Sequence, residues 1–146
     1  MIYEDRVESD LEKKAKKVQG KTFVPEDIDF SLLHTIPYRY PGRKITVELA
    51  SNEFTCLCPF SGLPDFAVLT IIYVPGKKLI ELKSLKYYLY AYRNVKVYNE
   101  HVINKILDDL KNVLAPREIT VIGEFTSRGG IRNKVVATYP SPKKKK

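Results

Sequence analysis

The order of its periodic segments constrains the fold of this 146-residue chain most strongly. Two strand patterns of alternating or continuous apolar residues, 45–49 and 67–74, precede two helical patterns, and two more strand patterns follow them. In the second helical pattern, Asn99 is placed to cap the helix and Pro116 to end it. The apolar face of this helix consists of Ile103, Ile106, Leu107, Leu110, Val113 and Leu114. The β-β-α-α-β-β order predicts an α+β fold, an antiparallel sheet with both helices on one face.

The other elements are shorter or less regular. A short extended piece over 78–81 precedes the first helix, and the last two strands are expected over 119–125 and 134–139. The helical spacing of the first helix comes from Leu85, Tyr88, Leu89 and Tyr92. A sheet of four strands has two open edges, and assembly with further copies of the chain is one way to cover them.

Composition is that of a globular protein with one domain. Hydrophobic residues make up 44% and charged residues 29% of the chain, which is ordinary for a soluble protein. The apolar runs are too short to span a bilayer and the first residues do not form a secretory signal, so the expected location is the cytoplasm. Four of the formal charges of +8 belong to the terminal lysines. We expect a charged, irregular extension over 1–30, the folded domain over 31–140 and a disordered lysine-rich tail over 141–146.

Both cysteines lie in one segment, 53–66, that also carries an acid. Cys56 and Cys58 are separated by one residue, and Asp65 follows Cys58 by seven. Because Gly62 and two prolines interrupt the segment, it is predicted to be a shaped loop rather than a helix or strand. A thiol and a carboxyl on one rigid loop can perform nucleophilic attack with proton transfer. The sequence therefore predicts covalent chemistry at Cys58, with Cys56 packed in the core.

Simpler interpretations of the same residues stay open at this point. Cys58 can be an inert buried thiol, and Asp65 can make only a local turn hydrogen bond. The two cysteines and two histidines of the chain also match a tetrahedral zinc site by number, although their spacing is poor: Cys56, Cys58, His34 and His101. A disulfide framework is not expected from two cysteines this close together.

Charged residues near the helices suggest binding sites. Glu100 lies in the first turn of the second helix, where an acid favours the positive helix terminus or accepts hydrogen bonds from a purine-like ring. Lys83 and Lys86 share a helix face, and the paired-glycine turn in 128–132 has an arginine on each side. Such cations are typical of phosphate binding and also of solvated surface. The chain has no Gly-x-Gly-x-x-Gly, which excludes a Rossmann dinucleotide site.

Several short motifs occur together in a specific order over about residues 35–139. They are Glu53-Phe54-Thr55, Cys58-Pro59, Gly62, Pro64-Asp65-Phe66, Glu81-Leu82-Lys83-Ser84-Leu85-Lys86-Tyr87-Tyr88, Tyr92-Arg93-Asn94, Glu100 and Phe125-Thr126-Ser127-Arg128-Gly129-Gly130-Ile131. In these motifs the chain resembles the NADPH-dependent 7-cyano-7-deazaguanine reductases. The resemblance implies the tunnelling fold (T-fold), whose β-β-α-α-β-β order agrees with the pattern above and whose copies assemble into a barrel-like ring.

The resemblance also implies a reaction. Members of this family reduce the nitrile of 7-cyano-7-deazaguanine to the amine of 7-aminomethyl-7-deazaguanine, a step of queuosine biosynthesis for tRNA modification. By this resemblance Cys58 attacks the nitrile carbon to form a covalent thioimide, Asp65 supplies the proton, and NADPH delivers hydride twice. A protonated thioimide accepts hydride more readily than a nitrile does.

Binding residues and partners follow from the same resemblance. The residues implied to hold the substrate are Ile80, Glu81, Leu82, Asn99 and Glu100. Those implied to bind NADPH are Lys83, Ser84, Lys86, Arg128 and Gly129. Many members carry histidine directly before the binding glutamate, where this chain has Asn99, and His101 follows instead. The implied partners are the small-molecule substrate and further copies of the chain, as a homodecamer of two pentamers with active sites between subunits, without metal, nucleic acid or membrane.

Two other functions compete with this one. A related enzyme keeps the cysteine and aspartate but adds ammonia to the same nitrile in tRNA, forming an amidine. The run Lys83-Ser84-Leu85-Lys86 counts against it, because that enzyme has no use for an NADPH site. A non-catalytic tRNA-binding module is suggested by net charge alone.

Overall fold

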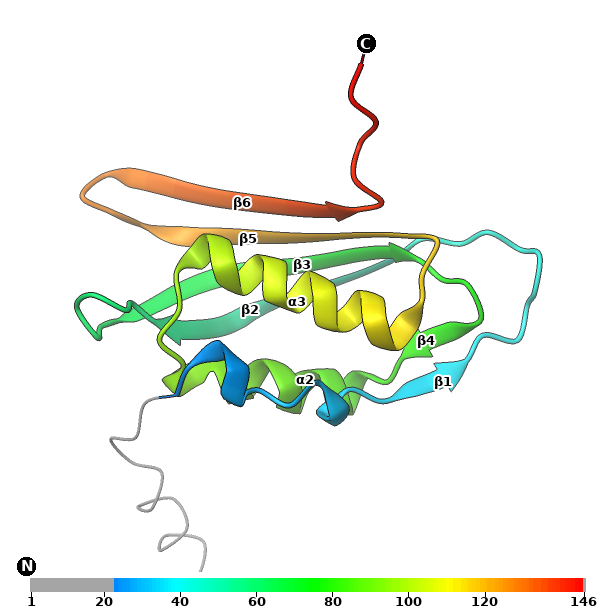
Figure 1. Ribbon diagram of the computed structural model, residues 1–146, viewed down its shortest axis with the longest axis horizontal. Helices are drawn as coiled ribbons and strands as arrows, with labels where there is room; N and C mark the ends of the chain where they lie inside the picture. Colours follow the sequence, from blue (N-terminus) through cyan, green and yellow to red (C-terminus); the bar gives the residue numbers. More distant parts are fainter. Residues whose placement is uncertain (1–22, 146) are drawn as a thin grey trace, which may run out of the picture.

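Four long strands form the main antiparallel sheet of the computed structural model, which describes residues 23–145 (Figure 1). The strand order is β2-β3-β5-β6, with β2 at Val47–Leu57, β3 at Pro64–Val74, β5 at Glu118–Arg128 and β6 at Ile131–Tyr139. The helices α2 (Leu82–Tyr90) and α3 (Asn99–Leu114) both lie on one face of it. The predicted α+β fold with an antiparallel sheet and two helices is therefore confirmed. Of the extension expected over 1–30, residues 1–22 lie outside the described residues.

Smaller elements extend the domain toward the N-terminus. The strand β1 (Thr35–Pro37) pairs with β4 (Lys78–Ile80), and three short 3-10 helices, η1, η2 and η3, are present at Pro25–Asp27, Phe30–Leu32 and Ala91–Asn94. The Phe23 N–H donates to the Asn94 carbonyl at 2.8 Å, and the Lys96 N–H donates to the Phe23 carbonyl at 2.8 Å. Ile28 belongs to the core. The packed domain thus begins before residue 31, because backbone pairing and one buried side chain attach the segment from 23 to the helices.

The strands β2 and β3 are longer than the sequence pattern predicts. Their pairing continues through Phe54 opposite Ala67 and Cys56 opposite Asp65, and the connecting loop covers only 58–63. The prediction of a loop over all of 53–66 is therefore wrong at both ends. Local proline and glycine signals suggested a loop, but cross-strand pairing continues past them, and proline is tolerated at the first position of a strand.

The core lies between the sheet and the two helices. Alternate residues of β3 and β5 face the helices and are buried, and α3 contributes a full apolar face to the same core. Each fully buried aliphatic side chain contributes about 1.5–3 kcal/mol relative to an exposed one. Gly123 on β5 permits a close approach of α3, because a Cβ added there would lie 2.6 Å from Ile103 Cδ1. A larger residue at this position would therefore force the side chains of Ile103 and Phe125 to shift.

A buried polar cluster joins the two helices. The Asp109 carboxylate of α3 accepts hydrogen bonds from the Tyr88 hydroxyl of α2 at 2.6 Å and from the Lys105 ammonium at 2.8 Å. The hydroxyls of Tyr88 and Tyr92 lie 2.8 Å apart, and burial raises the pKa of both. These contacts fix α2 and η3 against α3.

No helix within 23–145 combines the length and the apolar character needed to cross a membrane.

The two ends of the domain carry different groups of candidate residues. The β2–β3 loop, the β5–β6 turn and the start of α3 lie together at one end, on the left of Figure 1. The strand β4 and the start of α2 lie at the other end. The 11 residues of β3 connect these ends, and at about 3.3 Å per residue the strand spans roughly 35 Å.

Candidate active site

Cys58 opens the short loop between β2 and β3. Its N–H donates to the Leu63 carbonyl at 2.8 Å, and its carbonyl accepts from the Gly62 N–H at 2.9 Å. Gly62 has a φ of 71°, a conformation that favours glycine. These backbone hydrogen bonds hold the loop closed, and they leave the Cys58 side chain partly exposed at the end of the sheet.

The two thiols of this segment lie in contrasting environments. Hydrogen bonds from the Ser61 side chain and from the backbone of Ser61 and Phe60 lower the pKa of Cys58, because they stabilise the thiolate. Cys56 is fully buried, as predicted, and burial, followed by the charge of Asp65, raises its pKa to about 12. The thiolate is the nucleophilic form of cysteine. Cys58 is therefore suited to attack an electrophile, and Cys56 is not.

This contrast gives a test by alkylation. We expect iodoacetamide at pH 8 to modify Cys58 rapidly and to leave Cys56 unmodified in the folded protein, because only Cys58 is accessible and has a lowered pKa. Peptide mass spectrometry after a time course measures both rates. Cys58→Ala should abolish the fast labelling and Cys56→Ala should keep it. Equal labelling of both cysteines in the native protein would contradict this assignment.

Asp65 lies in β3, directly opposite Cys56 in the antiparallel register. Its carbonyl accepts a hydrogen bond from the Thr55 hydroxyl at 2.8 Å, and its side chain is 14% exposed. The Asp65 carboxylate pairs with the Arg128 guanidinium of β5, with 3.1 Å between Oδ1 and Nη2. A purely local turn role does not fit, because the carboxylate contacts a residue from another strand.

The start of α3 lies beside this loop. The Val97 N–H donates to the Leu57 carbonyl at 3.0 Å, which attaches the segment before α3 to the end of β2. Glu100 is exposed in the first turn, and its Oε1 lies 3.4 Å from Nδ2 of Asn133 on β6. One copy of the chain therefore places the loop that begins at Cys58 and the first turn of α3, which holds Glu100, at the same end of the sheet.

The prediction that Asn99 caps α3 is wrong. Tyr98 occupies the cap position, without a side-chain hydrogen bond, and Asn99 is the first helical residue. Asn99 Oδ1 is buried and has no hydrogen-bond partner within residues 23–145. The His101 ring instead meets the Tyr98 ring edge-on, with 5.8 Å between centroids.

The backbone implied to hold the substrate lies at the far end of the sheet. The Ile80 N–H donates to the Tyr73 hydroxyl at 3.0 Å, and the Glu81 N–H donates to the His34 carbonyl at 2.9 Å. Tyr73 is near the end of β3, whereas Asp65 is at its beginning. A single copy therefore separates Ile80 and its neighbours from Cys58 by most of the strand length.

The first turn of α2 carries most of the predicted cofactor residues. The Glu81 carboxylate caps this helix by accepting from the N–H groups of Lys83 and Ser84 at 2.8 and 2.7 Å, and these bonds lower its pKa. The buried Ser84 hydroxyl donates to the Glu81 carbonyl at 2.7 Å and accepts from the His34 N–H at 2.9 Å. Lys83 and Lys86 are exposed. Their exposure fits contact with a phosphate, whereas Ser84 makes internal hydrogen bonds.

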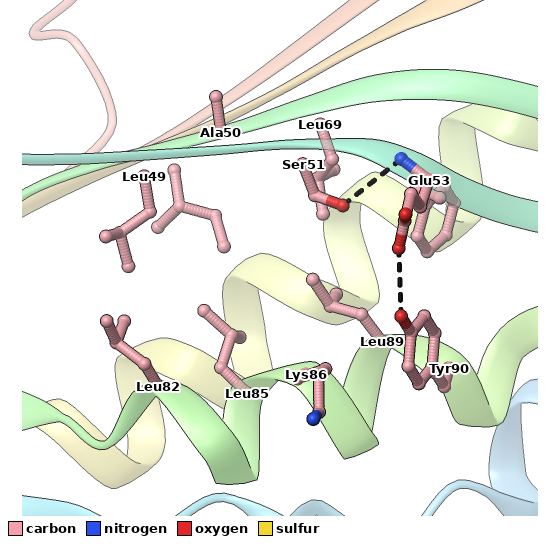
Figure 2. A pocket seen from close by; sticks show the side chains of 12 residues that line it. Leu49, Ala50, Ser51, Glu53, Leu69, Leu82, Leu85, Lys86, Leu89 and Tyr90 are labelled. Carbon is pink, nitrogen blue, oxygen red and sulfur yellow. Dashed lines mark hydrogen bonds between the residues drawn. The ribbon is translucent and has the colours of Figure 1, made fainter.

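Arg128 and Gly129 lie in the β5–β6 hairpin, away from these lysines (Figure 1). The predicted cofactor residues are therefore not brought together within one copy of the chain. A cavity of about 300 Å³ lies between α2 and β2, beside Lys86 (Figure 2). Its lining is mainly apolar, and the Tyr90 hydroxyl donates to Glu53 Oε2 at 2.8 Å on one side of it.

The zinc alternative has no geometric support. Within residues 23–145 no three side chains of histidine, cysteine, aspartate or glutamate lie close enough to hold a metal ion. His34 contacts the start of α2, whereas His101 lies in the first turn of α3. The two histidines therefore belong to opposite ends of the domain.

The sequence does not predict three contacts of this site. Ser61 stabilises the Cys58 thiolate, Arg128 pairs with Asp65, and Asn133 contacts Glu100. The alternation of β6 gave a weak signal for Asn133, since it shares a face with the partly buried Val135. Nothing in the local sequence marks Ser61 as a thiol partner.

Comparison with known proteins identifies relatives of this chain. The family model described as QueF-like protein matches residues 64–144. The NADPH-dependent 7-cyano-7-deazaguanine reductase of Thermoanaerobacter pseudethanolicus is 52% identical over 130 residues, covering 89% of this chain and 98% of that protein. The enzyme of the same name from Caldicellulosiruptor bescii is 56% identical over 114 residues, covering 78% of this chain and 87% of the relative.

A solved structure shares the fold at much lower identity. The archaeosine synthase QueF-Like in the apo form superposes with a TM-score of 0.63 and 20% identity, over 67% of this chain and 96% of that one. This likeness shows the fold alone. The identities of 52% and 56% to the two reductases, over 98% and 87% of their lengths, show the family as well as the fold. The chain belongs to the family of NADPH-dependent 7-cyano-7-deazaguanine reductases.

Proposed function

We propose that this protein uses NADPH to reduce the nitrile of 7-cyano-7-deazaguanine to the aminomethyl group of 7-aminomethyl-7-deazaguanine, in queuosine biosynthesis. The observation that carries the proposal is that one end of the sheet holds both Cys58, whose pKa is lowered, and the partly buried carboxylate of Asp65. Identities of 52% and 56% to reductases of that name support the same reaction. The free base, rather than tRNA, is the proposed substrate.

The side chains at this end of the sheet support a proposed first chemical step. Asp65 takes the proton of the Cys58 thiol, and the resulting thiolate attacks the nitrile carbon, which forms a C–S bond and breaks one π bond of the nitrile. Asp65 then passes the same proton to the nitrogen. The product is a thioimide on Cys58. Glu100 accepts hydrogen bonds from ring N–H groups and orients the base. Bound NADPH supplies the two hydrides that a four-electron reduction requires, and the exposed cations Lys83 and Lys86 suit its phosphates.

The complete site is proposed to form between two copies of the chain. One copy separates Cys58 from the Ile80–Leu82 backbone by the length of β3, so a second copy must bring its β4–α2 end to the cysteine loop. The open sheet supports assembly, because its face away from the helices exposes Phe66, Val68 and Val136 by 54%, 41% and 54%. A ring of such sheets, stacked as two pentamers, would cover this face and both edge strands.

A mixing experiment tests the shared site. Cys58→Ala and Lys86→Glu alter opposite ends of the chain, so mixed assemblies contain some sites with both ends intact. After co-expression or joint refolding, random mixing should give wild-type activity in about a quarter of the sites when NADPH is kept well below the raised KM of Lys86→Glu. Mixing Cys58→Ala with Asp65→Asn is the matched control and should restore nothing, since both changes lie at the same end. Equal failure of both mixtures, with mixed assembly shown by native mass spectrometry, would contradict a shared site.

NADPH consumption tests the reaction itself. We expect oxidation of two NADPH for each 7-cyano-7-deazaguanine consumed, because nitrile reduction to an amine takes four electrons. Lys86→Glu should raise the apparent KM for NADPH by about tenfold or more, through loss of one phosphate contact and gain of a repulsive charge. Turnover with ammonia and nitrile-bearing tRNA, without NADPH oxidation, would instead establish the amidine-forming reaction.

A further inference from the structure

We propose that Arg128 is a positioning residue for Asp65, which fixes the carboxylate as a proton relay between the Cys58 thiol and the nitrile nitrogen. This inference rests on the proposed nitrile chemistry. It gives Arg128 a different role from the phosphate contact that the sequence suggests, because in this structure the guanidinium is engaged inside the cysteine end of its own chain.

The contact follows from the position of β5 beside β3. Ala67 of β3 lies opposite Phe125 of β5 in the antiparallel register, so residues beyond Phe125 run alongside the beginning of β3. Arg128 Nη2 donates to the Pro64 carbonyl and also lies 3.1 Å from Asp65 Oδ1. A single guanidinium thus holds both the backbone before Asp65 and its carboxylate.

The paired-glycine turn explains why Arg128 points this way. Gly129 and Gly130 have φ values of 56° and 75°, as a tight two-residue hairpin requires, and Arg128 pairs with Ile131 across it. The β5–β6 register shifts between Phe125 and Arg128. Such an irregularity at the end of a sheet redirects a side chain. The turn that resembles a phosphate-binding loop therefore directs Arg128 toward Asp65.

Burial and charge support a positioning role. The Asp65 side chain is 14% exposed, whereas Arg128 is 50% exposed, so the carboxylate needs a partner more than the guanidinium does. Three groups face Asp65: Arg128 from β5, the thiol of Cys56 across the register, and the thiol of Cys58 in the adjoining loop. Arg128 is the cation among them.

An Asp65 carboxylate that is paired with Arg128 can accept one proton and pass the same proton on. The carboxylate accepts the proton of the Cys58 thiol, the thiolate forms the C–S bond, and the same proton moves to the nitrile nitrogen as one π bond breaks. No external acid is needed, and Asp65 ends the step as the carboxylate that pairs with Arg128. Misplacing this carboxylate by about 1 Å is enough to slow such a transfer substantially.

The test measures thioimide formation without NADPH. Wild type, Arg128→Ala, Arg128→Lys and the matched control Arg132→Ala are mixed with saturating 7-cyano-7-deazaguanine, and intact mass follows the adduct over time. We expect Arg128→Ala to slow adduct formation by about 10- to 100-fold at saturating base. Arg128→Lys should recover part of the rate, and Arg132→Ala should leave it unchanged. The KM for NADPH, measured in turnover, should change less than the adduct rate does.

The possible outcomes separate this inference from the proposed function. Absence of an adduct in wild type would overturn the nitrile chemistry itself. A second outcome is that wild type and Arg128→Ala form the adduct equally fast, while Arg128→Ala has a raised KM for NADPH. This result would establish the phosphate role of Arg128 and overturn the positioning role. If Arg128→Ala does not fold, the same measurement is made with Arg128→Gln, whose amide can still donate to the Pro64 carbonyl. Adduct formation at the wild-type rate in Arg128→Gln would contradict the proposal.

Discussion

Replacing Cys58 with alanine should lower NADPH-dependent nitrile reduction by about 1,000-fold or more, because the covalent step then has no nucleophile. The loop should keep its shape, since its hydrogen bonds to Leu63 and Gly62 use the Cys58 backbone and not the thiol. Steady-state NADPH oxidation at saturating nitrile measures the effect, and circular dichroism checks the fold.

The matched change is Cys56→Ala in the same strand. Cys56 is buried and its raised pKa keeps it a neutral thiol, so its loss should affect packing and leave turnover within a few-fold of wild type. A Cys58→Ala protein with near-normal turnover, or a Cys56→Ala protein that is folded and inactive, would contradict the assignment of the nucleophile.

Replacing Asp65 with asparagine should slow turnover by about 100-fold or more, as expected for loss of an acid–base group. The amide has nearly the same shape but cannot carry the proton from thiol to nitrile nitrogen. The strand pairing should persist, because the Thr55 hydroxyl contacts the Asp65 carbonyl and not its side chain. Adduct formation and steady-state turnover both report the change.

Glu53→Gln provides the control for the loss of a carboxylate in this part of the chain. Glu53 is exposed on β2 and bonds to the Tyr90 hydroxyl, away from Cys58. Its replacement should leave turnover nearly unchanged. If Asp65→Asn is folded and also nearly as active as wild type, Asp65 serves only to hold Arg128 and the proton must reach the nitrile by another route.

The element order could be predicted from the sequence because it depends on local periodicity. The apolar face of α3 and the alternation of β5 are visible in single segments, and both are present in the structure. The extent of β2 and β3 could not be predicted in the same way. Cys56 and Asp65 are paired across two strands, and that pairing overrides the local proline and glycine signals between them.

The sequence proposes the candidate site as a set of residues and not as an arrangement in space. Motifs predict Cys58 and Glu100 as site residues, and the elements that carry them meet at one end of the sheet. They gave no distance between Cys58 and Ile80, which depends on the length of β3. The partner of Asp65 also depends on which strand lies next to β3, and here that strand is β5, which carries Arg128.

The most direct test of the account is the intact mass of the wild-type protein with 7-cyano-7-deazaguanine, before and after NADPH is added. We predict a gain equal to one whole molecule of the base per chain, located on Cys58 by peptide fragmentation. NADPH should then remove this adduct and release the aminomethyl product. An unmodified protein, an adduct on Cys56, or an adduct that persists with NADPH unoxidised would contradict the account.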